Sequence, residues 1–122
     1  MFHSTRGEKL VSSPEAILNG LADDGGLYVI DSIPSLDYHE LLNDDYQTIA
    51  AKVLNKFFPE FSYDEIKHEI DLAYANFDIE EVVGMKDAGN AYFLELYHGP
   101  TLAFKDQALV VLPRLMKLSK EN

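Results

Sequence analysis

Hydrophobic side chains recur at helical spacing in two adjacent stretches in the middle of the chain. The first stretch places apolar and aromatic residues on one helical face, at Tyr46, Ile49, Ala50, Val53, Leu54 and Phe57. The second begins with a capping box, Ser62 and Glu65, and then repeats the same spacing. Its apolar positions are Ile66, Ile70, Ala73, Tyr74 and Phe77. The pattern predicts two amphipathic helices, separated at Pro59, that pack against each other.

Turn residues divide the region before these helices. Ser13, followed by Pro14 and Glu15, is a helix-start signal because serine caps free amides and proline tolerates the first helical position. This short helix should run to about Leu21. A tight turn at residues 24–26, which contains two glycines, and a short strand at residues 27–30 should follow it.

In the last third of the chain, the sequence pattern predicts a strand followed by a helix. A polar turn at residues 87–90 precedes residues 91–97, whose aromatic and leucine content suits a strand. Residues 106–118 are apolar over most of a helical circumference, so a helix there needs burial on several sides. An interior proline forfeits a backbone hydrogen bond and costs roughly 3 kcal/mol. We therefore expect a bend or a break at Pro113.

The predicted helices and strands indicate an α/β protein, and the composition fits one compact domain and limits the classes of partner it can bind. The 122 residues are 47% hydrophobic, and they contain no repeat or linker that would mark a second domain. Acidic residues number 21 against 10 basic ones, for a net charge of -11. Nucleic acids and anionic membranes are bound by clustered Lys and Arg, so neither is an expected partner.

Cysteine and histidine usage excludes several kinds of site. The chain has no cysteine, which excludes disulfides, thiolate metal sites and cysteine nucleophiles. The four histidines, at positions 3, 39, 68 and 98, lack metal-ligand spacing, so no metal site is predicted. The first ten residues lack the apolar core of a secretory signal, and no apolar stretch is long enough to cross a bilayer. We expect a cytoplasmic protein.

The candidate chemistry lies between the last predicted strand and helix, in residues 98–106. The string reads His-Gly-Pro-Thr-Leu-Ala-Phe-Lys-Asp, and such strand-to-helix connections commonly hold small-molecule sites. Leu102 and Phe104 could shield Lys105 from water, and a desolvated lysine is more readily the neutral amine that attacks an aldehyde. On spacing alone, an ordinary surface lysine at a helix start is the commoner explanation.

The same string resembles the signature of the threonine synthase family, His-Gly-Pro-Thr-x-x-Phe-Lys-Asp. Residues 4–7, Ser-Thr-Arg-Gly, and residues 20–29, Gly-Leu-Ala-Asp-Asp-Gly-Gly-Leu-Tyr-Val, resemble two further stretches of that family, in the same order and at similar separation. The departures are Ile30, where the family often has proline, and Pro113. Neither departure touches the lysine motif.

The resemblance implies a pyridoxal-phosphate enzyme of the tryptophan-synthase-β-like fold (type II). It implies that Lys105 forms the Schiff base with the cofactor and that the reaction converts O-phospho-L-homoserine and water to L-threonine and phosphate. When released, the lysine amine is a carrier for the protons that move between carbons. Lys105 is therefore both the catalytic and the cofactor-binding residue implied by the resemblance.

The resemblance also implies that this chain is incomplete as an enzyme. Members of the family are several times longer, and their phosphate cradle and asparagine motif follow the lysine helix. The glycine pair at residues 25 and 26 is better explained by a turn than by a cradle for the phosphate. We expect residues 1–122 to be a truncated N-terminal helical and small-sheet domain, inactive by itself. The oligomeric state is not predictable from these features.

Four further residues near these motifs have ordinary structural explanations. His98 could assist proton transfer or contact the cofactor phosphate, but a turn histidine more often bonds backbone. Asp106 should act structurally at a helix start, and the Thr101 hydroxyl usually bonds local backbone. Arg6 could meet a substrate phosphate, although a surface ion pair is the simpler role. Asp106 is assigned a structural role and Arg6 no catalytic role, while His98 and Thr101 stay open as residues of the site.

Two other functions use the same residues. A threonine-synthase-like phospho-lyase would eliminate phosphate without making threonine, and it would need the same Lys105. A noncatalytic folding or interaction domain would instead dock its apolar last helix on a partner chain.

Overall fold

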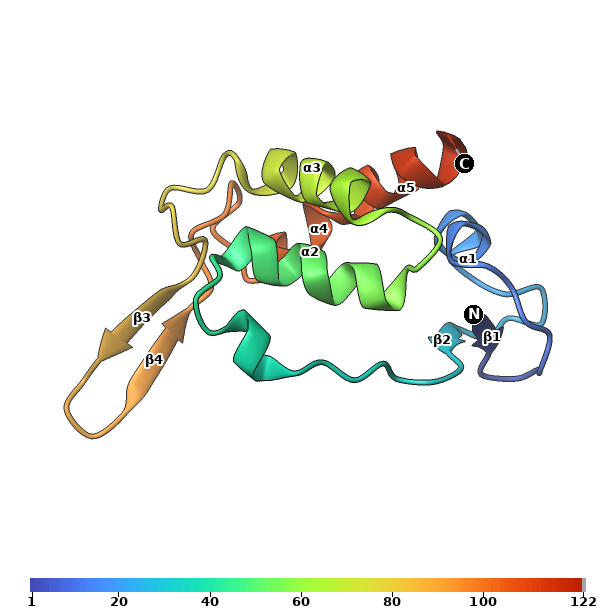
Figure 1. Cartoon of the computed structure of the whole chain (residues 1–122), viewed down its shortest axis with the longest axis horizontal. Helices are drawn as coiled ribbons and strands as arrows, with labels where there is room; N and C mark the ends of the chain where they lie inside the picture. Colours follow the sequence, from blue (N-terminus) through green and yellow to red (C-terminus); the bar gives the residue numbers. More distant parts are fainter. Residues whose placement is uncertain (122) are drawn as a thin grey trace.

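Two antiparallel helices form the centre of the computed structural model, which describes residues 1–121. They are α2, Tyr46–Phe57, and α3, Tyr63–Tyr74, and they pack side by side as the hydrophobic spacing predicts (Figure 1). The Asp45 carboxylate caps the first amide groups of α2. The capping box at the start of α3 is confirmed, because the Ser62 and Glu65 side chains each accept from the other's backbone N–H.

The last apolar segment covers this helix pair but is split into two helices. These are α4, Asp106–Leu109, and α5, Leu112–Glu121, so the break expected near Pro113 is confirmed. Pro113 stands second in α5, where the missing N–H costs little because the first N–H groups of a helix have no acceptor within that helix. The change of direction lets α5 pack on both α3 and α1.

The core lies where α2, α3 and α5 meet. Its buried side chains are Ala51, Phe61, Ile66, Ile70, Ala73, Tyr74, Val82, Val111, Leu115 and Leu118. Glu69 of α3 is also buried. Its two carboxylate oxygens pair with Arg114 at 3.3 Å and Lys117 at 2.9 Å, both on α5. This pairing joins α3 to α5 by charge as well as by apolar contact.

One small sheet and one helix lie at the end of the molecule that holds the N-terminus. Strand β1, Phe2–Ser4, pairs antiparallel with β2, Tyr28–Ile30, and α1 spans Ser13–Asn19. The strand β1 is absent from the sequence-based prediction. The predicted cap is wrong by one residue, because Ser12 caps α1 while the Ser13 hydroxyl donates to the Glu60 carboxylate at 2.6 Å.

A second hairpin projects from the opposite end (Figure 1). Its strands are β3, Gly84–Asp87, and β4, Tyr92–Glu95, joined by the predicted polar turn. Strand β4 falls inside the predicted range 91–97, whereas β3 was not predicted. A short 3-10 helix, η1, spans Tyr38–Leu41. Within residues 1–121, no helix combines the length and the apolar character needed to span a membrane.

Candidate functional site: the lysine loop

Lys105 stands at the point where the loop after β4 becomes helix α4. It occupies the N-cap position of α4, and its side chain is exposed. Three of the other lysines, Lys52, Lys67 and Lys117, are held in ion pairs. Lys105 has no ion pair or side-chain hydrogen bond within the described residues. Its amine is therefore available to an incoming group.

The apolar shield expected around Lys105 is not formed by this chain. Leu102 is 69% exposed and Phe104 is 65% exposed, so neither side chain removes water from the amine. The expectation that these two residues desolvate the lysine is wrong for residues 1–121, because no part of the described chain packs over them. Both side chains are instead unburied apolar surface beside a free amine.

A carboxylate clamp fixes the loop, which we define as residues 99–105 and call the lysine loop. Asp106 is only 4% exposed, and its two oxygens accept from the Thr101 backbone N–H and hydroxyl, each at 2.7 Å. Gly99 lies against the same carboxylate, where an added Cβ would come within 2.5 Å of Asp106. The structural role expected for Asp106 is confirmed. Thr101 bonds this side chain, whereas a backbone partner was expected.

The lysine loop also contains a strained backbone. Leu102 has φ of 60°, a left-handed conformation that residues other than glycine rarely adopt. Its amide donates to the Gly99 carbonyl at 3.0 Å, and the Asp106 amide donates to Ala103 at 3.0 Å. Strain of this kind persists only where the surrounding contacts fix the conformation, and the Thr101–Asp106 clamp is such a contact.

His98 precedes the lysine loop and sits between two acids. Its Nδ1 lies 2.7 Å from Asp78 Oδ1, and its Nε2 lies 3.3 Å from Glu95 Oε2. Desolvation opposes protonation of the ring, but the hydrogen bonds to Asp78 and Glu95 outweigh it and raise the His98 pKa. The backbone partner expected for His98 is present only at its carbonyl, which accepts from the Asp78 amide at 3.0 Å. The ring itself pairs with side chains.

The two N-terminal motifs meet each other at the other end of the molecule. The Ser4 hydroxyl donates to Asp24 at 2.6 Å, and the Gly26 amide donates to the same carboxylate at 2.9 Å. These bonds hold the pKa of Asp24 below its usual value. Arg6 donates to the Asp24 carbonyl at 3.2 Å, so its partner is backbone where a surface ion pair was expected. The glycine turn has φ of 75° at Gly25, as a turn requires.

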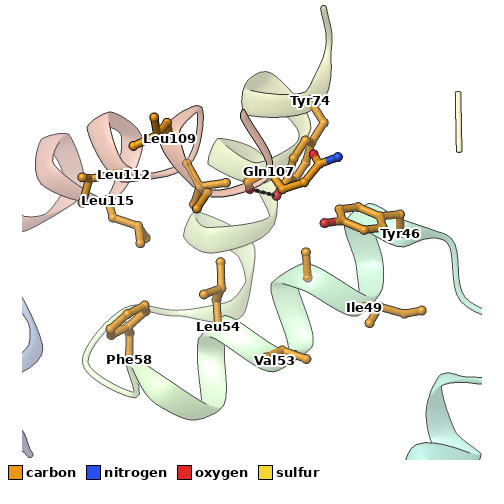
Figure 2. Close-up of a pocket in the computed structure, with 13 residues that line it drawn as sticks. Tyr46, Ile49, Val53, Leu54, Phe58, Tyr74, Gln107, Leu109, Leu112 and Leu115 are labelled. Carbon is orange, nitrogen blue, oxygen red and sulfur yellow. Dashed lines mark hydrogen bonds between the residues drawn. The ribbon is translucent and has the colours of Figure 1, made fainter. Parts of the chain in front are cut away.

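An apolar groove of about 560 Å³ lies between α2 and the α4–α5 segment, and sequence patterning did not reveal it (Figure 2). Thirteen residues line it: Tyr46, Ile49, Ala50, Val53, Leu54, Phe58, Tyr74, Gln107, Ala108, Leu109, Val111, Leu112 and Leu115. The Tyr74 hydroxyl, which donates to the Gln107 carbonyl at 2.7 Å, is one of its few polar groups. Burial raises the Tyr74 pKa well above its ordinary value. The groove suits apolar surface and offers no cationic group to a phosphate.

The described residues supply an amine for a cofactor but little else that would hold one. No cluster of His, Asp and Glu suited to a metal ion occurs in residues 1–121. The two glycines at 25 and 26 belong to the turn that leads into β2, where the Gly25 amide donates to the Ala22 carbonyl at 2.8 Å. A free amine on a clamped loop fits condensation with an aldehyde cofactor. The phosphate of such a cofactor would need further backbone amides from elsewhere.

Comparisons with known proteins agree with the motifs. A family model described as the threonine synthase N terminus matches residues 1–74. The chain is 41% identical to the threonine synthase of Schizosaccharomyces pombe, with 98% of this chain covered, and 35% identical to that of Saccharomyces cerevisiae, with 96% covered. In each case the chain spans 25% of the relative's length.

Solved structures agree with the sequence relatives. The structure of pyridoxal-phosphate-bound threonine synthase from Brucella melitensis superimposes with a TM-score of 0.91 at 35% identity, covering 98% of this chain and 27% of that one. Yeast threonine synthase superimposes with a TM-score of 0.85 at 34% identity, covering 96% of this chain and 26% of that one. The α/β helical and small-sheet arrangement therefore matches a quarter of a larger fold.

Proposed function

Because this chain belongs to the threonine synthase family, we propose that residues 1–122 form the N-terminal domain of a threonine synthase. The whole protein would convert O-phospho-L-homoserine and water to L-threonine and phosphate, with pyridoxal phosphate as its cofactor. The Brucella melitensis relative has pyridoxal phosphate bound, which supports this assignment. The domain would end just after the helix that follows the cofactor lysine.

The observation that carries the proposal is the free amine of Lys105 within the family's lysine motif. In our proposal this amine condenses with the aldehyde of the cofactor. Pyridoxal phosphate, when bound, supplies an electron sink for carbanions formed on the substrate. Lys105 Nζ would hold the protons that move between substrate carbons, as a positioned amine can. Asp106 and Thr101 would keep the start of α4, and with it Lys105, in place.

In our proposal, the rest of the protein, and not this domain, excludes water from Lys105. Condensation needs the un-ionised amine, and burial of a lysine favours that form. Leu102 and Phe104 flank Lys105 with exposed apolar surface. In the complete protein, we propose that further polypeptide packs on these two side chains, excludes water from Lys105 and supplies the phosphate cradle. The isolated chain should therefore have no turnover.

A chimera tests this function directly. Residues 1–122 would replace the aligned quarter of the Schizosaccharomyces pombe enzyme, to which they are 41% identical. We expect the chimera to release phosphate from O-phospho-L-homoserine and to form threonine, and the isolated chain with added cofactor to release none. Lys105→Ala should abolish the activity of the chimera, whereas Lys56→Ala, at an exposed lysine on α2, should leave it unchanged.

Two outcomes would contradict the proposal. One is an active chimera that keeps its activity after Lys105→Ala. The other is a chimera that folds and retains cofactor colour but makes no threonine. In the second case, product analysis would identify simple elimination of phosphate, the activity of a related phospho-lyase. Turnover by the isolated chain would overturn the claim that this domain is incomplete.

We also propose that the complete protein is a cytoplasmic enzyme that acts on a small phosphorylated amino acid and binds no nucleic acid. The lack of cysteine means that no fold-stabilising disulfide depends on an oxidising compartment. The net charge of -11 disfavours a polyphosphate partner.

A further inference from the structure

Both nitrogens of the His98 ring face carboxylate oxygens. Nδ1 is 2.7 Å from Asp78 and Nε2 is 3.3 Å from Glu95, and the His98 side chain is only 12% exposed. A neutral imidazole carries one N–H, so it can donate to only one of these acids and turns a lone pair toward the other. The protonated ring donates to both. The two contacts therefore favour the protonated, imidazolium form of His98.

This cluster joins three segments that are separate in the sequence. Asp78 belongs to the loop after α3, Glu95 ends β4, and His98 leads into the lysine loop. The Asp78 amide also donates to the His98 carbonyl, so the contact is made by backbone and side chain together. Gly84 of β3 lies beneath the cluster, where an added Cβ would come within 2.7 Å of Glu95 and 3.2 Å of His98. The close approach depends on that glycine.

Backbone strain flanks the cluster on both sides. In residues 1–121, only Val82 and Leu102 have positive φ without being glycine, at 64° and 60°. Val82 lies in the loop that holds Asp78, and Leu102 lies in the lysine loop that follows His98. Conformations of this kind are strained and need surrounding contacts to maintain them. The two strained loops are the two that His98 connects.

We propose that protonated His98 is a positioning residue, which holds the lysine loop in its strained conformation by bridging Asp78 and Glu95. His98 does not touch the reacting atoms. It acts through the loop backbone on the direction of Lys105, and the importance of that direction rests on the function proposed above. The bridge itself is a property of this chain and can be tested without cofactor.

The bridge should weaken as pH rises. The folded-state pKa of His98 is raised above its ordinary value of 6.5, because its bonds to Asp78 and Glu95 outweigh desolvation. A raised pKa means that the stabilisation is fully present below the unfolded value and is lost as pH rises through the folded value. The lysine loop should therefore be held most firmly below about pH 6.5 and loosen at higher pH.

Tyr97 and Lys86 also act on the bridge, through Glu95. Interaction with Tyr97 and then His98 keeps the Glu95 pKa below its usual value, while Glu95 raises the Tyr97 pKa above its ordinary value. Glu95 therefore remains an ionised partner while the His98 ring loses its proton.

The test is a pH titration of the isolated 122-residue chain by NMR. The His98 ring signals give its midpoint, and amide hydrogen exchange gives protection factors for Thr101 and Leu102, whose N–H groups close the lysine loop. We expect the midpoint above about 6.5. Protection should fall about threefold or more as His98 deprotonates, which is the scale of a partly exposed ion pair.

Three variants make the experiment decisive. His98→Gln should lower protection at low pH and remove its pH dependence. Glu95→Gln should lower the His98 midpoint and preserve protection at high pH, because a side-chain amide can donate to the neutral ring. His39→Gln is the matched control, since His39 pairs with Asp37 at 2.8 Å on the remote helix η1. It should change nothing in the loop.

The proposal is overturned if loop protection stays flat while His98 titrates, or if the pH dependence survives in His98→Gln. If His98→Gln fails to fold, the Glu95→Gln result alone decides, because an unchanged pH profile there contradicts the bridge. Failure of the proposed function would look different. In that case the loop would follow His98 as expected, while Lys105→Ala left the chimera active.

Discussion

Apolar side chains are buried in the helical core and exposed to water in the lysine loop. Ile66 and Ile70 of α3 are 0% and 1% exposed, packed between α2 and α5. Leu102 and Phe104 beside Lys105 are more than half exposed. Scattered exposed apolar residues are ordinary, and in our proposal this group beside Lys105 meets further polypeptide of the longer protein. Most of the helical core is buried within this chain, whereas the lysine loop keeps its apolar side chains exposed.

The sharpest test of this contrast pairs one substitution from each region. Ile70→Ala should destabilise the chain by about 3 kcal/mol, because it leaves a cavity in a fully buried site. Phe104→Ala removes more side-chain atoms but should cost less than about 0.5 kcal/mol, because those atoms are already in water. Urea denaturation of the two variants gives both values. Similar losses of stability would remove the distinction between the regions.

The buried charge that joins α3 to α5 should give the next largest effect. Desolvation opposes ionisation of Glu69, but its bonds to Lys117 and Arg114 outweigh this and keep its pKa below the ordinary value of 4.5. Glu69→Gln should cost about 2 kcal/mol at neutral pH. A lowered pKa contributes stability that is present above the unfolded value and lost as pH falls through the folded one.

Thermal melts across the acid range check this assignment. The unsubstituted chain should lose stability below about pH 4.5, while Glu69→Gln should lose less over the same interval. Glu8→Gln, at an exposed acid in the loop before α1, serves as the control and should keep the original slope. If the unsubstituted chain and Glu69→Gln lost stability equally as the pH falls, the role given to the buried Glu69 carboxylate would be contradicted.

A smaller effect than that of Glu69→Gln is expected from the Thr101–Asp106 clamp in the lysine loop. Thr101→Val keeps the side-chain shape but removes the hydroxyl donor to the buried Asp106 carboxylate, which should cost about 1 kcal/mol. Thr101→Ser keeps the donor and should cost less. Urea denaturation measures both, and hydrogen exchange at residues 101–106 locates the change. Equal behaviour of the two variants would mean that the clamp does not hold the loop.

Sequence patterning predicted the helical region well because its signals are local. The apolar spacing of α2 and α3 and the capping box at Ser62 involve residues within one or two turns of each other. The strand β1 escaped prediction because it is three residues long and pairs with β2, which lies far along the chain. The strand β3 escaped because its sequence, Gly-Met-Lys-Asp, lacks the branched and aromatic residues typical of strands. The cap of α1 was misplaced because Ser13 has a distant partner, Glu60, that no local pattern reveals.

The same distinction applies to the candidate site. The motif at residues 98–106 located the lysine loop, and the structural role of Asp106 followed from its place at a helix start. The acids around His98 were not predicted, because Asp78 reaches it only through the tertiary fold. Leu102 and Phe104 do not form the expected shield, because burial depends on neighbours that residues 1–121 do not supply.

Lys105 is, in our proposal, the cofactor lysine of the complete enzyme, and chemical trapping tests this role most directly. The chimera with the Schizosaccharomyces pombe enzyme would be loaded with pyridoxal phosphate, reduced with borohydride and digested for mass spectrometry. We predict a single modified peptide, with the cofactor attached to Lys105, and no modified peptide from Lys105→Ala. Attachment at a different lysine, or undiminished attachment after Lys105→Ala, would contradict this role.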